Sequence, residues 1–274
     1  MRLAAKLATA LTLLATAPSH ADMAPFLIGV DGRTTIPSGT YAGLPDPNYG
    51  RLTFLYAHGD HYHSKGVYTY TGPNLGTGTA VTVSPSNYVP EGSAAPFALE
   101  PGSGAFAGLN ISGPTAGSPG SDIEIGSVEA LRGFEPGADE TLLLNSSGGR
   151  WSGSIADAEL VIELVGATTG LSILDASGRP IFAGGTTLAL GLADASFSFA
   201  PIFAAVAAGD YVAQFRLHDA RADGFGSSGV FEFRLNAATT AVPEPGSLAM
   251  ASIAGLVASA AALRGRLRRT PPAA

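Results

Sequence analysis

The chain has 274 residues, of which 46% are hydrophobic, and it contains no cysteine, which excludes disulfides and thiolate chemistry. Residues 22–242 contain 9 Lys and Arg against 21 Asp and Glu, so this part carries a net charge of −12. Such a charge argues against nucleic acid as a partner and mildly concentrates cations. About 220 residues are enough for one large or two small domains.

Residues 1–21 have the pattern of a secretory signal peptide. A short start with Arg2 and Lys6 precedes an apolar run over 7–17, and Ser19 and Ala21 place small residues at −3 and −1. The apolar run is too short to span a bilayer, which needs roughly 20 residues. We expect cleavage after Ala21 and secretion of the remainder across the inner membrane.

Short runs typical of β-strands recur along the body. They are rich in β-branched or aromatic residues and are separated by Gly, Pro, Asn, Asp or Ser. No segment of the body shows a long 3.6-residue apolar period, so we predict an all-β, sandwich-like fold. The predicted strands are Phe26–Val30, Arg51–Ala57, Gly66–Tyr70, Ala80–Val83, Ser121–Val128, Leu142–Leu144, Glu159–Val165, Leu171–Leu174, Thr186–Leu190, Ala195–Phe199, Tyr211–Leu217 and Val230–Leu235.

The stretch 96–120 is rich in Pro, Gly and Ser and marks the predicted internal boundary. It separates an N-terminal β unit, residues 22–95, from a C-terminal β unit, residues 121–240. The alternative is one continuous sandwich in which 96–120 is a long loop.

Histidine is scarce, yet three of the five histidines, His58, His61 and His63, lie within six residues. The flanking runs read as two strands joined by Gly59-Asp60, which suits a two-residue hairpin turn. In that register His58 and His61 face each other with Cβ atoms about 5 Å apart. His63 lies on the same face as His61, because strand side chains alternate with period two.

Three converging imidazoles favour zinc, which neutral imidazole nitrogens bind at about 2.0–2.1 Å in four-coordinate sites. The fourth ligand could come from Asp60, His218 or water, and Cu(II) and Ni(II) could compete in vitro. The alternative is an exposed polar turn whose histidines only titrate. Tyr56, Tyr62, Tyr68 and Tyr70 are expected to pack the hairpin.

A second candidate is the segment 217–226, in which His218 ends a predicted strand and Asp219 and Asp223 follow. It could complete the zinc site or form a weak cation site of its own. A polar strand end and turn is the favoured interpretation, because the segment lacks the ligand density of a calcium-binding EF-hand loop.

The C-terminal part begins with Val242-Pro243-Glu244-Pro245, continues in a charge-free apolar run over 247–263 and ends in a cluster of arginines. A helix of these 17 residues is about 26 Å long, and the arginines would stay on the cytoplasmic side. Residues 242–269 thus resemble the PEP-CTERM sorting signal of Gram-negative bacteria. The resemblance implies recognition by an exosortase, cleavage near Pro243–Pro245, and association with the envelope or exopolysaccharide. An uncleaved membrane anchor is the alternative.

The string over 54–64, Phe-Leu-Tyr-Ala-His-Gly-Asp-His-Tyr-His-Ser, together with this tail resembles the Zur-repressed PEP-CTERM proteins first recognised in cyanobacteria. Its His-Gly-Asp-His-Tyr-His core is also similar to a zinc-binding motif of streptococcal histidine-triad surface proteins. These resemblances imply that His58, His61 and His63 are ligands and that the protein is made under zinc shortage.

The expected function is therefore non-catalytic zinc binding at the cell surface, for scavenging, storing or handing on the metal. A structural or adhesive matrix protein without a metal function is the main alternative, although a single tryptophan, Trp151, weighs against a sugar-stacking face. A metal-dependent hydrolase is less favoured, because it needs further ligands and a general base, for which only His218 remains.

Overall fold

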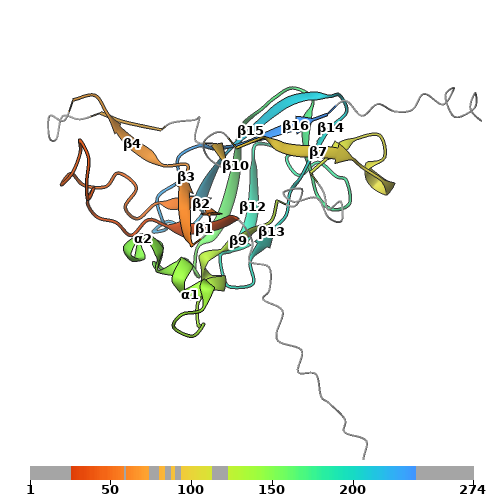
Figure 1. Cartoon of the computed structure of the whole chain (residues 1–274). Helices are drawn as coiled ribbons and strands as arrows, with labels where there is room; N and C mark the ends of the chain where they lie inside the picture. The colour runs from red at the N-terminus through yellow and green to blue at the C-terminus, as the bar shows by residue number, and fades with distance from the viewer. Residues whose placement is uncertain are drawn as a thin grey trace, which may run out of the picture.

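The computed structural model describes residues 26–58, 60–73, 80–83, 88–89, 94–112 and 123–238. The described chain consists mostly of β-strands with few helices, so the predicted all-β, sandwich-like body is confirmed (Figure 1). The predicted signal peptide over 1–21 and the predicted sorting signal over 242–269 lie outside the described residues. Within the described ranges, no helix has both the length and the apolar character needed to cross a bilayer.

Two large sheets and a separate strand pair make up the body. The five-stranded sheet has the spatial order β13 (Ser198–Phe199), β9 (Ile125–Ser127), β1 (Phe26–Val30), β2 (Leu52–His58) and β3 (His61–Lys65). The nine-stranded sheet has the order β11 (Leu171–Leu174), β14 (Ile202–Ala205), β8 (Asn110–Ile111), β7 (Phe97–Pro101), β16 (Phe231–Ala237), β15 (Gly209–Asp219), β10 (Glu159–Ala167) and β12 (Thr187–Leu192), with β6 (Tyr88–Val89) also paired to β16. The separate pair consists of β4 (Tyr68–Thr71) and β5 (Ala80–Val83).

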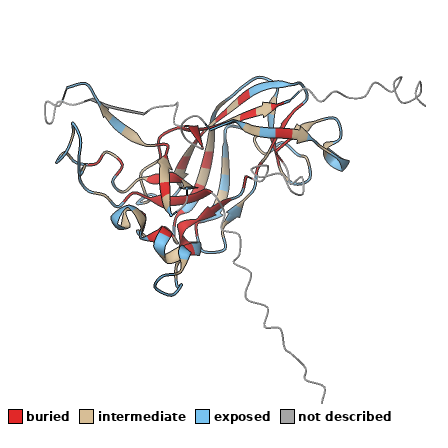
Figure 2. Ribbon diagram, in the orientation of Figure 1, coloured by how far each residue is buried: buried red, intermediate tan, exposed pale blue. Residues whose placement is uncertain are grey.

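A layer of phenylalanines joins the two large sheets. Phe54 on β2 stacks on Phe231 on β16, with ring centroids 4.3 Å apart, and Phe26 on β1 meets Phe233 edge to face at 5.8 Å. All four rings are buried in one continuous core, and the buried residues follow the strands of both sheets (Figure 2). Offset-stacked and edge-to-face pairs are the favoured geometries for aromatic rings, so the sheets are held by specific contacts as well as by burial.

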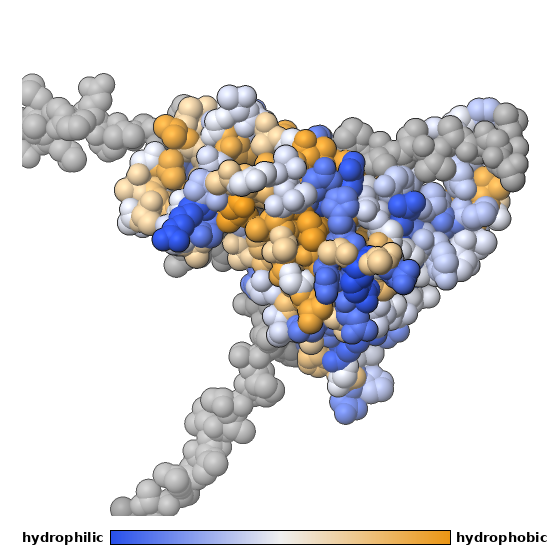
Figure 3. Space-filling view, turned by 180° about the vertical axis from the view of Figure 1, so that it is seen from behind, coloured by the Kyte–Doolittle hydropathy of each residue, from blue (hydrophilic) through white to orange (hydrophobic). Residues whose placement is uncertain are grey.

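The surface mixes apolar and hydrophilic residues, and the face turned away from the view of Figure 1 carries apolar residues between hydrophilic ones (Figure 3). Among the large apolar side chains left exposed are Leu192 at the β12 edge and Val206 after β14.

Strands from both sides of the predicted boundary share each large sheet. β1 pairs in parallel with β9, and β16 pairs in parallel with β6 and β7. The segment 96–120 itself contributes β7, β8 and a 3-10 turn, η2 (Gly104–Phe106). The sheets are therefore not divided at this segment. Parallel pairing between distant segments leaves no local sequence signal of the kind that marks a hairpin.

One predicted strand is wrong: Leu142–Leu144 belongs to helix α1 (Asp139–Leu144). Leu143 and Leu144 are both buried, and neighbouring residues of a strand would point to opposite faces. Asp139 and Glu140 occupy the first turn, where negative charge favours a helix. A short turn α2 (Ser146–Gly149) follows, and η3 (Val128–Leu131) contacts α1.

Candidate metal centre

The three clustered histidines lie at the tip of the β2–β3 hairpin. In this antiparallel pair His58 is opposite His61, and His63 is opposite Tyr56. The predicted register is thus confirmed, whereas Gly59 of the predicted turn lies outside the described residues. β3 is the last strand of its sheet, so the tip is free of neighbouring strands of that sheet on one side.

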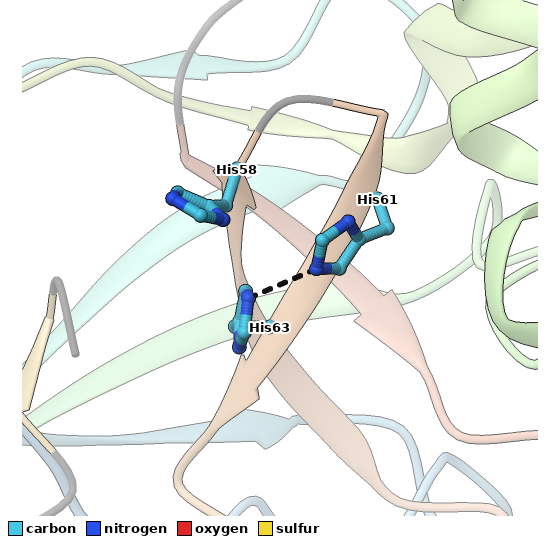
Figure 4. Close-up of side chains that lie close together, drawn as sticks. All are labelled: His58, His61 and His63. Atoms are coloured by element: carbon cyan, nitrogen blue, oxygen red, sulfur yellow. Dashed lines mark hydrogen bonds between the residues drawn. The ribbon is translucent and has the colours of Figure 1, made fainter. Parts of the chain in front are cut away.

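The three imidazole rings converge on one point (Figure 4). Ring centroids are 5.7 Å apart for His58 and His61, 5.3 Å for His58 and His63, and 4.9 Å for His61 and His63. One ring nitrogen from each histidine lies within 4.8 Å of the others, and the Nε2 atoms of His61 and His63 are 3.1 Å apart. These side chains can hold one metal ion, and they form the only group of this kind found in the described ranges.

The spacing fits a small tetrahedral ion. Nitrogens bound to zinc at 2.0–2.1 Å in a tetrahedron are about 3.3 Å apart, close to the His61–His63 separation. Because all three ligand nitrogens lie within 4.8 Å of one another, no separation has to shrink by more than about 1.5 Å, which small side-chain rotations at an exposed tip can provide. His58 is exposed, and His61 and His63 are half-buried, so an ion has a route from solvent.

Asp60 occupies a position different from the one predicted for a ligand. Its Oδ1 accepts a hydrogen bond from Nδ1 of His61 at 2.9 Å, and it is not a member of the converging group. An ionised carboxylate can only accept hydrogen bonds, so Nδ1 of His61 carries the proton. In the neutral ring, Nε2 then has a lone pair that is available to a metal ion bound between the three imidazoles. Carboxylates commonly orient metal-binding histidines in this way. The bond from His61 also lowers the pKa of the Asp60 carboxyl.

Tyrosine side chains pack the part of the hairpin that lies below its exposed tip. Tyr62, between the two histidines of β3, points to the opposite face and is buried, and this burial raises the pKa of its hydroxyl. Tyr56 stacks on Phe26 of the core with ring centroids 5.6 Å apart. Tyr68 lies under the guanidinium of Arg51, and Tyr70 contacts the ring of Tyr41. The packing role predicted for the tyrosines thus agrees with the contacts of Tyr56 and Tyr62, whereas Tyr68 and Tyr70 belong to β4 of the separate strand pair.

His218 is not brought into the histidine group. It lies on β15, between β16 and β10 of the other large sheet. Its Nδ1 is 2.8 Å from Oγ of Ser227, and its Nε2 is 2.8 Å from Oε2 of Glu163. Both ring nitrogens therefore have protein partners, and neither partner was found by sequence reasoning. Glu163 lies opposite Arg216 across the strand pair, so its link to His218 is diagonal and depends on sheet register.

The segment after His218 is organised around the carboxylate of Asp219, whose side chain is fully buried. It accepts hydrogen bonds from the guanidinium of Arg221 and from the backbone N–H groups of Glu159, Arg221 and Phe225. Burial raises the pKa of Asp219, but these bonds outweigh it and lower the pKa to about 2. The favoured interpretation, a polar strand end and turn, agrees with these contacts.

A comparison of the chain with protein-family models, with curated proteins and with solved structures finds no match.

Proposed function

We propose that the protein is an exported, envelope-associated zinc-binding protein that scavenges, stores or hands over zinc when the metal is limiting. The observation that carries the proposal is the convergence of His58, His61 and His63 at one point of an exposed hairpin tip. Export and recognition by an exosortase rest on the sequence of the two ends alone.

Three protein ligands suit acquisition and exchange better than permanent structural binding. Structural zinc sites are usually closed by four protein ligands, whereas a site with three keeps a position for water or for a ligand of a partner. The core beneath the hairpin is packed by aromatic contacts, so the fold has no evident need of a metal. The net charge of −12 over residues 22–242 raises the local concentration of cations.

The test is a zinc titration of the purified protein against a chromophoric chelator. We expect one equivalent of zinc, lost in the triple variant His58→Ala, His61→Ala, His63→Ala. The matched control is His218→Ala, which removes a histidine outside the group and should leave the zinc equivalent unchanged. Retained affinity in the triple variant would end the proposal.

A further inference from the structure

A second feature involves none of the three clustered histidines: a cavity of about 410 Å³ lies between the segment over 33–48 and strand β4. Its size is in the range of small-molecule sites. The residues that line it include Tyr41, Tyr68 and Tyr70, together with Arg33 and Arg150.

Buried carboxylates hold the two guanidinium groups in place. Asp31 is fully buried, and its carboxylate accepts bidentate hydrogen bonds from Nε and Nη2 of Arg150. Asp46, whose side chain is 1% exposed, accepts from Nε of Arg33 at 2.6 Å. Each arginine is thus paired through one edge of its guanidinium group, and this fixes the orientation of the other edge.

The polar atoms that remain for a ligand are mainly donors. Neither terminal nitrogen of Arg33 has a partner within the described part of the chain, and the same holds for Nη1 of Arg150. The Asn48 amide is already used, because its Nδ2 bonds Asp46 and the carbonyl of Tyr68 and its Oδ1 accepts from the N–H of Tyr68. Both oxygens of Asp46 also accept bonds from protein groups. A ligand that brings acceptors therefore matches the unused N–H groups of the two arginines.

We propose that this cavity binds a small organic carboxylate, with its charged end on Arg33 and Arg150 and its body against the tyrosine rings. A carboxylate matches the planar fork of a guanidinium group and forms charge-assisted bonds. The hydroxyls of Tyr41 and Tyr70 are bonded to backbone carbonyls, so their ring surfaces are positioned to pack against a ligand. The negative charge of the remaining surface is screened over about 8 Å in physiological salt, whereas the guanidinium contacts are direct.

The test is calorimetric titration of the purified protein with two pairs of probes. Phenylacetate is compared with 2-phenylethanol, and glucuronate with glucose, so that an aromatic acid and a sugar acid are each matched by a neutral analogue. We expect one of the acids to bind at least about tenfold more tightly than its neutral analogue, since each charge-assisted bond contributes that much. Added salt should weaken the binding.

Arg33→Met should abolish this preference, and Arg179→Met, which removes an exposed arginine elsewhere, should not. Because Arg33→Met also leaves Asp46 without its closest partner, a second variant, Ile36→Trp, fills the cavity and leaves the ion pairs in place. His58→Ala should bind the probe normally, which separates this site from the zinc proposal. The proposal is overturned if no acid binds up to about 10 mM, if neutral and charged probes bind alike, or if binding survives in both cavity variants.

Discussion

Replacing Asp60 by Asn tests whether this carboxylate positions His61 without binding the metal itself. The change keeps the size of the side chain and removes the negative charge that accepts the Nδ1 proton at 2.9 Å. Loss of such an orienting partner costs about 10- to 100-fold in metal affinity. The Asp60 side chain is 95% exposed and its bond competes with water, so we expect the lower end, a weakening of about tenfold.

The assay is a competition titration of zinc with a chromophoric chelator at pH 7.5, repeated for Asp60→Asn, His61→Ala and Asp223→Asn. Asp223 is an exposed aspartate outside the histidine group and serves as the matched control, for which no change is expected. The stoichiometry should stay at one in Asp60→Asn and vanish in His61→Ala. If Asp60→Asn loses zinc as completely as His61→Ala, the carboxylate is itself a ligand. An unchanged affinity would show that the hydrogen bond does not orient the ring.

Three further predictions concern acidity and packing. Zinc affinity should be much lower at pH 5 than at pH 7.5, because protons compete for the imidazole nitrogens, and equal affinity at the two pH values would contradict imidazole ligation. Phe54→Ala should lower the free energy of unfolding by about 3–5 kcal/mol, measured by denaturant titration, because the ring is fully buried between the sheets. Above about pH 4, Asp219→Asn should be less stable than the parent protein, because the hydrogen bonds that lower the pKa of Asp219 stabilise its ionised form in the folded state. As the pH falls toward 2, Asp219 becomes protonated and this stabilisation is lost, so the difference measured by thermal melting should disappear.

The histidine hairpin could be predicted from sequence because everything that determines it is local. Two strands separated by a tight turn can pair in few ways, and the period of two then decides which side chains share a face. The facing pair His58 and His61 follows from that argument, and the structure has it. The role of Asp60 did not follow, because a residue in a turn can direct its carboxylate either to the metal position between the histidines or to Nδ1 of a neighbouring histidine.

Contacts between distant segments were not accessible in the same way. The partners of His218 depend on the diagonal position of Glu163 on β10 and on Ser227 in a following segment, and therefore on how the nine-stranded sheet assembles. Asp31 and Arg150 are 119 residues apart, and no pattern in either segment points to the other. Helix α1 was missed because three consecutive leucines fit a buried strand and a short helix equally well.

The parallel pairing of β1 with β9 makes the hairpin dependent on a distant segment, because β9 begins only at Ile125 whereas the hairpin ends at Lys65. β2 lies next to β1, and Phe54 rests on a ring supplied by β16 near the other end of the body. A peptide cut from the first part of the chain would carry all three imidazoles and yet lack the support that aligns them. Affinity for metal should therefore report on whether the whole body has folded.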